Sequence, residues 1–467
     1  MKTAVEELSP TRVRLSVEVP FEELKPSLDK AYREVAKQAR IPGFRPGKVP
    51  PRVIDMRIGR GAVLTEAVND ALPELYSKAV QEAEVFTLGN PDVEITELED
   101  GKDLAFTAEV EVRPKFELPD LSTLSVTVDS AVVTPDDVEA YLDSLRERFG
   151  SLKAAQRPAE SGDYTTIDLS ATAGGQPVED AQATGLSYQI GSESLLAGLD
   201  DAIAGLSAGE VATFTTTLAG GEHEGEEADV TVTVQSVKVK ELPALDDDFA
   251  QLASEFDSLG ELRADTRKQL ERSKLMQQAS QARDKGIEAV LEAVDIPLPE
   301  KYVEHEQEHL RESVDQQVER MRLTLDDYLT MIGKTAEEHE AEIVEQSQRG
   351  VKTGFVLDKL ANDEQIGVDQ NELSYFIADQ AQRMGVPVDY LAQQLVDSGQ
   401  IGSAVTEVRR GKAASLIAEK IKVTDEAGNP VDVKVQVEAL VAAQQADLEA
   451  AGEADAADAD AAEADAE

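Results

Sequence analysis

The sequence predicts an α+β protein of several domains, and its length together with three changes of pattern along the chain supports this class. A chain of 467 residues is too long for one hydrophobic core, so about three domains are expected. The first 112 residues mix strand and helix patterns, and residues 160–240 carry short alternating strands with one helix. From residue 244 to about 423 the pattern is almost wholly helical.

The chain is strongly acidic, with a formal net charge of −48 and a pI near 4.3. Nucleic acid repels a polyanion, so general affinity for DNA is not expected. The absence of cysteine from the sequence excludes disulfides and thiolate metal sites. Neither a secretory signal nor a run of about 18 apolar residues is visible, so we expect a cytoplasmic protein with no membrane partner.

One stretch departs from this acidity, between Lys25 and Arg60. Ten Lys and Arg residues stand there against Asp29, Glu34 and Asp55, which gives a local net charge of +7. A solvated helix face is the ordinary explanation of such a run. Because this one is centred on a loop, we favour a surface for an anionic partner.

The first 112 residues predict a small α+β domain in the order β-α-loop-α-β-β. Period-2 alternation marks the strands, and apolar residues at helical spacing mark the helices. The pattern predicts a strand at 11–19, a helix with apolar positions from Phe21 to Val35, a helix with apolar positions from Leu64 to Val80, and strands at 91–96 and 104–112.

A proline-rich loop joins the two helices and contains the stretch "GFRPGKVP", residues 43–50, which we call the finger. Its prolines are incompatible with a helix interior or a sheet ladder, and Gly43 and Gly47 allow tight turns. The finger therefore presents Phe44 at the tip of a stiffened loop, with Arg45 and Lys48 beside it.

Residues 113–150 predict a connecting segment. An extended stretch at 124–128 leads to Thr134, which has the features of a helix N-cap because Pro135 and two acidic residues follow it. The helix is expected to end at Phe149. Beyond it, residues 160–240 predict a compact, mostly antiparallel sheet with a helix at 194–206 packed on it.

The remaining chain divides into a helical part and a tail. Thr324 and Thr335 each precede an acidic first turn, and Asp369 and Glu372 have the spacing of a capping box. Alternation of apolar and polar residues returns at 431–437. The last residues, "EAAGEADAADADAAEADAE", are too poor in apolar surface to offset the cost of ordering, so they predict a disordered tail.

One motif points to metal chemistry and is attributed to chance. His305 and His309 match the H-E-x-x-H pattern of zinc proteases, whose spacing places both imidazoles on one helix face. The surrounding residues are charged on all sides, and neither His223 nor His339 has a spacing suited to a third ligand. We therefore expect no metal and no other cofactor.

The finger closely resembles the ribosome-docking loop of the bacterial trigger factor family, whose usual form is G-F-R-x-G-K-x-P. The likeness extends from residue 1 to about 440. It implies that Phe44 and Arg45 are the docking pair. Pro46 stands where the family often has Lys, which removes one charge and stiffens the loop. The docking residues implied are Gly43, Phe44, Arg45, Pro46, Gly47 and Lys48.

The resemblance also implies a domain order. In full it is a ribosome-binding domain at 1–112, a linker packing with the helical domain at 113–150, an FKBP-like peptidyl-prolyl isomerase domain at 151–243, an elongated helical chaperone domain with arms at 244–434, and an acidic disordered tail at 435–467. The middle domain carries its likeness most clearly in "IGSESLLAGLDDAIAGLSAGE", residues 190–210.

An FKBP-type isomerase needs no nucleophile, because an apolar pocket favours the twisted X-Pro amide over the planar one. Family members line that pocket largely with aromatic residues, but only Tyr164, Tyr188 and Phe214 lie between 151 and 243. We therefore expect weak activity. The pocket residues implied by position are Leu169, Val178, Glu179, Leu195, Leu196, Leu199 and Val232.

The function implied is a chaperone bound to the large ribosomal subunit near the polypeptide exit tunnel. Its clients are nascent and unfolded polypeptides, which it keeps unfolded for later folding or export. Whether it forms a homodimer away from the ribosome is left undecided by the sequence. Apolar stripes such as Val290 and Tyr375 are expected to form mostly helical core, with some residues left exposed for clients. Two alternatives are a free cytosolic FKBP-type isomerase and a helical scaffold, and neither explains the finger.

Overall fold

The computed structural model describes residues 1–38, 44–45, 47–173, 176–218 and 225–440, except the side chains of 179–180. The predicted tail therefore lies almost wholly outside the described residues. The chain divides into two compact units, residues 1–130 with 278–467 and residues 131–277. The division falls within helix α7 (Leu259–Ala293). Helices and separate antiparallel sheets together confirm the α+β multidomain class.

The first unit begins with a four-stranded antiparallel sheet in the order β1-β2-β4-β3. Its central strands alternate strictly, so Leu15, Val17 and Phe106 are buried on one face. The edge strand β1 was not predicted, because it is charged and leaves Val5 half exposed. The strands are β1 (Lys2–Ser9), β2 (Arg12–Val19), β3 (Thr87–Glu97) and β4 (Leu104–Val112).

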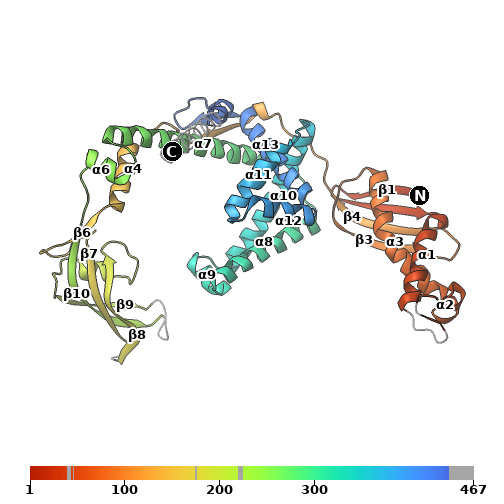
Figure 1. Ribbon diagram of the computed structural model, residues 1–467, viewed down its shortest axis with the longest axis horizontal. Helices are drawn as coiled ribbons and strands as arrows, with labels where there is room; N and C mark the ends of the chain where they lie inside the picture. Colours follow the sequence, from red (N-terminus) through yellow and green to blue (C-terminus); the bar gives the residue numbers. More distant parts are fainter. Residues whose placement is uncertain (39–43, 46, 174–175, 219–224, 441–467) are drawn as a thin grey trace, which may run out of the picture. The chain divides into compact units, whose positions relative to one another are not determined.

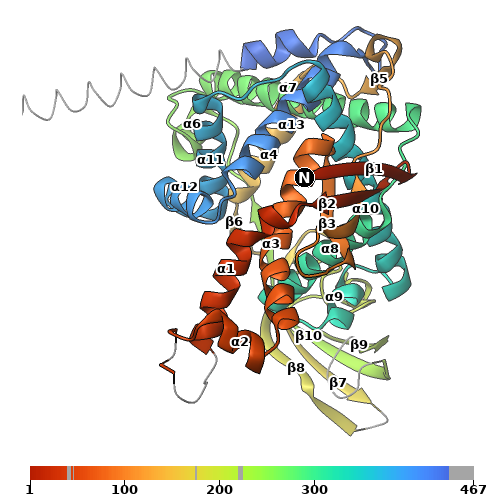
Figure 2. The same cartoon turned by 90° about the vertical axis from the view of Figure 1, so that its right-hand side faces the viewer.

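Helices α1 (Phe21–Gln38) and α3 (Arg60–Ala83) cover the buried face of this sheet. Between them lies the short helix α2 (Pro51–Arg57), in a stretch where the prolines of the sequence predicted only a loop. Pro50 is the N-cap of α2 and Pro51 its first residue, where a proline suits a helix start. In Figures 1 and 2, α2 lies at the end of α1 and α3 that is distant from strand β1.

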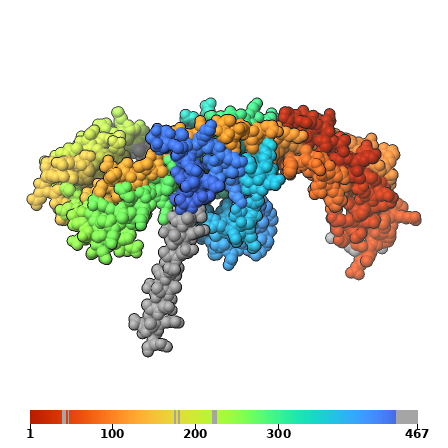
Figure 3. All heavy atoms as spheres, turned by 90° about the horizontal axis from the view of Figure 1, so that it is seen from above, coloured from red at the N-terminus to blue at the C-terminus, as the bar shows by residue number. Residues whose placement is uncertain are grey.

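The rest of the first unit is mainly helical. The helix starts predicted at Thr324, Thr335 and Asp369 are present, and each has a capping box. A short 3-10 helix (Leu121–Thr123) precedes α7 in the chain. The space-filling view shows the C-terminal helical residues before residue 441, in blue, as one group (Figure 3). The helices are α8 (Glu300–Met321), α9 (Leu325–Met331), α10 (Ala336–Asp363), α11 (Gln370–Met384), α12 (Val388–Asp397) and α13 (Ile401–Lys420).

Two features of this part are decided by tertiary contacts. Strand β5 (Ser125–Val128) pairs in parallel with β11 (Lys422–Asp425), a partner almost 300 residues away in sequence. The alternation at 431–437 is typical of a strand, but residues 433–440 are helical. Val433, the first residue of this helical stretch, is buried in the helical core, which explains why it is apolar.

The N-terminal sheet is fixed to the helices by charged contacts at the end of β4. Asp358 of α10 accepts hydrogen bonds from Arg113 at 2.7 Å and from Arg410 of α13 at 2.8 and 2.9 Å. Glu111 accepts from the backbone N–H groups of Lys301 and Tyr302 at 2.9 and 2.8 Å, so a strand side chain caps helix α8.

The second unit contains a five-stranded antiparallel sheet in the order β6-β10-β7-β8, with β9 paired to β10. Helix α5 (Leu199–Ile203) is shorter than the predicted 194–206, because Gly198 takes a left-handed φ of 85° just before it. The strands are β6 (Ser151–Ala154), β7 (Tyr164–Ala173), β8 (Gln176–Gln189), β9 (Val211–Thr217) and β10 (Glu227–Glu241).

A smaller helical core completes the second unit. Helix α4 (Pro135–Arg148) begins at the N-cap predicted at Thr134, and the structure adds a capping box in which Asp137 is the reciprocal partner. It packs with α6 (Asp247–Ala253), and Phe149 meets Phe249 edge to face with ring centroids 6.0 Å apart. No helix in the described part of the chain is long and apolar enough to cross a membrane.

Candidate functional sites

The described part of the finger is exposed. Phe44 keeps 42% of its surface accessible, so a large part of its apolar ring faces solvent. Arg45, Gly47 and Lys48 are also exposed, and neither cation makes an ion pair with the described residues. Gly43 and Pro46, the other implied docking residues, lie outside the described residues.

The base of the finger is attached to the helices. The Gly47 N–H donates to the carbonyl of Ala36 at 2.7 Å, and Gly47 needs its φ of 80° to do so. The Lys48 N–H closes a turn onto the Arg45 carbonyl at 3.0 Å. Val49 is buried against Ile54 and its neighbours. The loop is therefore anchored on one side while Phe44, Arg45 and Lys48 project into solvent.

A polar network fixes the helices that carry the finger. The Tyr32 hydroxyl of α1 donates to Asp55 of α2 at 2.6 Å and accepts from Arg60 of α3 at 3.0 Å. Arg60 also donates two hydrogen bonds to Asp100 in the β3–β4 loop. Burial raises the pKa of Tyr32, so its hydroxyl stays a donor. The Arg60 hydrogen bond lowers the pKa of Asp100, which keeps that carboxylate charged.

Five of the seven implied isomerase residues form a core group and a half-buried group in the second unit. Leu199 and Val232 are fully buried, and Val178 is 6% exposed, so all three lie in the core. Leu169 and Leu196 are half-buried and pack against both apolar clusters of the sheet.

The remaining two implied positions differ from these. Leu195 is exposed, and Glu179 lies in β8 with its side chain outside the description. That these residues line one pocket stays a prediction.

A loop at the start of α5 carries Leu195 and Leu196, and one carboxylate holds it. Asp200 accepts hydrogen bonds from the Tyr188 hydroxyl at 2.9 Å, the Gly191 N–H at 2.7 Å and the Glu193 N–H at 3.2 Å. The role of Asp200 was not predicted from the sequence. Its place in the first turn of a helix just after a glycine is the signal that was available.

Phe214 was counted only as one of the few aromatics, but it occupies the same neighbourhood. It packs against both clusters that contain Leu169 and Leu196, and a Cβ built on Gly198 would meet its ring at 3.5 Å. The apolar surface beside the loop is therefore part aromatic.

The H-E-x-x-H pair lies on α8, with the imidazole centroids of His305 and His309 6.3 Å apart. Among the residues that the structure describes, no group of three or more His, Cys, Asp or Glu side chains could hold a metal ion.

Apart from Val435 and Val437 near the end of the described chain, the exposed large apolar side chains in the helical part of the first unit lie at two places. The first surrounds α9, where Met331 is 56% exposed, and the second is on α11 and α12, where Tyr375 is 69% exposed. Val290, by contrast, lies in the core as expected. The exposed residues are Met321, Leu325, Met331, Tyr375, Met384, Val388, Tyr390 and Val396.

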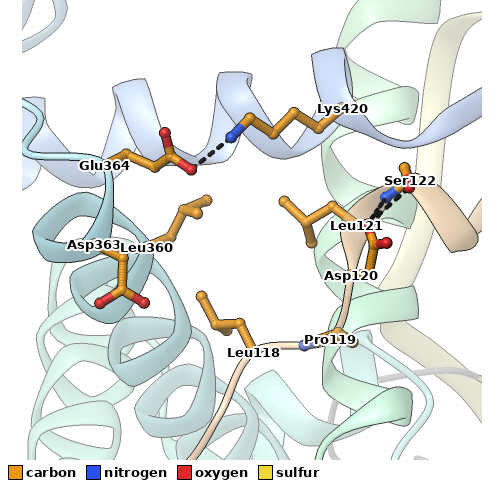
Figure 4. Close-up of a pocket in the computed structure, with 9 residues that line it drawn as sticks. All are labelled: Leu118, Pro119, Asp120, Leu121, Ser122, Leu360, Asp363, Glu364 and Lys420. Carbon is orange, nitrogen blue, oxygen red and sulfur yellow. Dashed lines mark hydrogen bonds and ion pairs between the residues drawn. The ribbon is translucent and has the colours of Figure 1, made fainter.

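A small pocket of about 320 Å³ lies where the chain leaves the N-terminal sheet and meets α10 and α13 (Figure 4). Leu118, Leu121 and Leu360 point into it, and Lys420 pairs with Glu364 at its rim. Leu121 and Leu360 belong to the main helical core. The pocket is therefore a depression over that core.

Family models match two long parts of the chain. Residues 1–145 match the bacterial trigger factor protein and residues 258–419 match the trigger factor C-terminus. A trigger factor of Thermobifida fusca is 56% identical over 432 residues, covering 92% of this chain and 93% of the relative. The chain belongs to the trigger factor family.

Further relatives agree over nearly the whole length. The trigger factor of Nocardia farcinica is 50% identical and covers 98% of both chains, and that of Saccharopolyspora erythraea is 51% identical over 93% of both. A solved trigger factor chaperone, described for promiscuous substrate recognition in folding and assembly, is 22% identical, with a TM-score of 0.49 over 90% of this chain and 99% of that chain.

Membership settles the class of function, which is a chaperone of the trigger factor type. A free FKBP-type isomerase is not favoured, because these trigger factors match the sheet and helical parts together at about half identity.

Proposed function

We propose that the chain is a cytoplasmic chaperone that docks on the large ribosomal subunit near the polypeptide exit and shelters nascent and unfolded polypeptides. The observation that carries this proposal is the finger, in which an exposed Phe44 stands beside two cations without carboxylate partners among the described residues. Phe44 can bury its ring against a ribosomal protein, and Arg45 can bind phosphate or carboxylate in a bidentate manner.

The charge distribution suits a reversible contact of this kind. Ribosomal RNA repels a chain with a net charge of −48 everywhere except at a confined basic surface. The anchored base of the finger lowers the conformational entropy that docking must remove. The contact is therefore specific in place and weak enough for release.

Co-sedimentation with large ribosomal subunits tests the docking proposal. Replacing Phe44, Arg45 and Lys48 together by Ala is expected to abolish binding and leave the fold intact, since all three are exposed. The matched control removes one exposed aromatic and two ion-paired cations of the same region, with Phe86, Lys78 and Lys102 replaced by Ala. Full binding by the finger variant would refute the docking role.

We further propose that the helical part holds clients by its exposed apolar side chains. Met side chains adapt to irregular surfaces, and scattered exposed residues give many weak contacts with fast release. A chain deleted for 151–243 tests this proposal. Strand β6 pairs Ser151 with Glu241, so the ends of the deletion are adjacent and a short linker can join them.

The deleted chain is expected to suppress aggregation of a refolding client that has no slow proline step. Its helical circular dichroism serves as the control for folding. If a folded deletion variant gave no protection at stoichiometric amounts, the holding surface would have to lie in the deleted residues 151–243. We call the five-stranded sheet in these residues the middle sheet.

Weak prolyl isomerase activity is the second candidate function, and we place it at the loop that Asp200 holds. The supporting observation is the half-buried set of Leu169, Leu196 and Phe214, which is apolar and partly aromatic. The test is Leu196→Phe, which adds a ring at a half-buried position. A faster rate on a proline peptide is expected, whereas an unchanged rate in a folded variant would contradict this placement.

The five segments predicted from the sequence are proposed as the functional division of the chain. Docking belongs to 1–112, isomerisation to 151–243 and client holding to 244–434, with 113–150 as the connecting segment. The tail from 435 has no function assigned.

A further inference from the structure

The cations of the first 112 residues fall into two sets. Outside the segment from Arg33 to Arg57 each Lys and Arg makes an ion pair, including Lys30 and Arg60 at its margins, and inside the segment Lys37 pairs with Glu34. The paired cations are Lys2, Arg12, Arg14, Lys25, Lys30, Lys37, Arg60, Lys78 and Lys102.

The unpaired cations are confined to the segment that surrounds the finger. Within the described ranges, which omit Arg40, no carboxylate lies in ion-pair reach of Arg33, Arg45, Lys48, Arg52 or Arg57.

This confinement is informative because the chain has 93 acidic residues against 45 Lys and Arg. With carboxylates in such excess, an exposed cation has many opportunities to pair. The two acidic side chains within the segment are already engaged, Glu34 with Lys37 at 2.7 Å and Asp55 with Tyr32 at 2.6 Å. The segment therefore keeps its positive charge available to a partner.

Helix α2 extends the available charge beyond the finger. Arg52 and Met56 are one turn apart, so they share a face, and Arg57 follows directly. Arg52 and Arg57 are exposed, and Met56 is 79% exposed. On the opposite side Ile54 is fully buried in the core that also holds Val49 at the base of the finger. The outer face of α2 is thus fixed relative to the finger.

We propose that Arg52, Met56 and Arg57 form a second contact surface, the α2 face, which binds the phosphate backbone of ribosomal RNA beside the finger. The inference rests on ribosome docking as the proposed function. RNA is favoured as the occupant because a series of guanidinium groups without intervening free carboxylates matches a regular series of phosphates. Met56 provides an adaptable apolar contact between the two charges.

The salt dependence of binding to large ribosomal subunits tests the α2 face. The double variant R52Q/R57Q is expected to lower the slope of log affinity against log salt by about one unit for each lost phosphate contact. The matched control, K78Q/K102Q, removes two paired cations and is expected to leave the slope unchanged. Met56→Ser is expected to lower affinity several-fold at every salt concentration without changing the slope.

Two further arms separate the possible failures. Phe44→Ala tests docking itself, and unchanged binding by this variant would contradict the proposed function. If Phe44→Ala loses binding but R52Q/R57Q leaves the salt slope unaltered, docking stands and only the α2 face is overturned. A short RNA duplex at low salt is expected to compete with subunits for the unmodified chain better than for R52Q/R57Q. If polyglutamate shows that difference and the duplex does not, the surface binds an acidic protein and the RNA assignment is wrong.

Discussion

The finger and the middle sheet were both assigned functions by resemblance, yet their implied residues differ sharply in burial. In the finger, Phe44, Arg45 and Lys48 are exposed on an anchored loop. In the middle sheet, Leu199 and Val232 are fully buried. A docking surface consists of residues that the fold leaves outside, whereas a pocket for an apolar amide uses the same residue types as the core beneath it. The difference shows that the sequence of a charged and aromatic motif indicates that its residues are exposed, whereas an aliphatic motif does not indicate whether its residues are in a pocket or in the core.

The largest expected effect separates core from pocket within the middle sheet. Leu199→Ala should lower the free energy of unfolding of this unit by about 2–5 kcal/mol, because a fully buried side chain is removed. Leu195→Ala should change it by less than about 0.5 kcal/mol, because Leu195 is exposed. Hydrogen exchange at the amides of β7 and β10 measures both. Equal effects would mean that Leu199 is not a core residue.

The second prediction concerns the anchoring of the finger. Tyr32→Phe removes the hydrogen bonds to Asp55 and from Arg60, which should cost about 1–2 kcal/mol and loosen α1 from α2. The sequence has no Trp, so Phe44→Trp provides a single fluorescent reporter at the finger. In that background, Tyr32→Phe should lower the fluorescence anisotropy of the indole. The matched control, Tyr76→Phe, changes a tyrosine in the other core of the same domain. If both changes lowered the anisotropy equally, the network would not position the finger.

The third prediction uses acid to test one carboxylate of the second unit, Asp137. In the second unit, hydrogen bonds from Lys274 and Thr134 lower the pKa of Asp137 from 3.8 to about 2. A depressed pKa stabilises the folded chain above pH 3.8, and this contribution disappears as the pH falls towards 2.

Amide exchange in α4 should therefore accelerate over that interval in the unmodified chain. In Asp137→Asn the contribution is already absent, so the same interval should produce a smaller change. An identical acid response in both chains would show that another carboxylate is responsible.

The smallest expected effect on stability is at the exposed apolar residues of the helical part. Replacing Met331 or Tyr390 by Ser should alter the free energy of unfolding by no more than about 0.5 kcal/mol, because both side chains are more than half exposed. Suppression of client aggregation should nevertheless decline. Val132→Ser, at a residue that is 68% exposed in the second unit, is the matched control. Equal loss of protection in all three variants would argue against a holding surface on the helices.

The sequence by itself determined the elements with strong local signals. Alternation predicted β2 and β4, and the caps at Thr134, Thr324, Thr335 and Asp369 predicted four helix starts, because these signals depend on neighbours within a few residues. The finger was equally visible, since prolines, glycines and an unexpected cation cluster are properties of sequence alone.

Only the tertiary structure decided the features that depend on distant partners. The parallel pairing of β5 with β11, the capping of α8 by Glu111 and the contact of Arg113 and Arg410 with Asp358 join residues separated by long stretches of chain. The same holds for the division of Leu195, Leu196 and Leu199 among exposed, half-buried and core positions. Burial is set by what the rest of the chain places against a side chain, and three leucines within five residues carry no local signal of that choice.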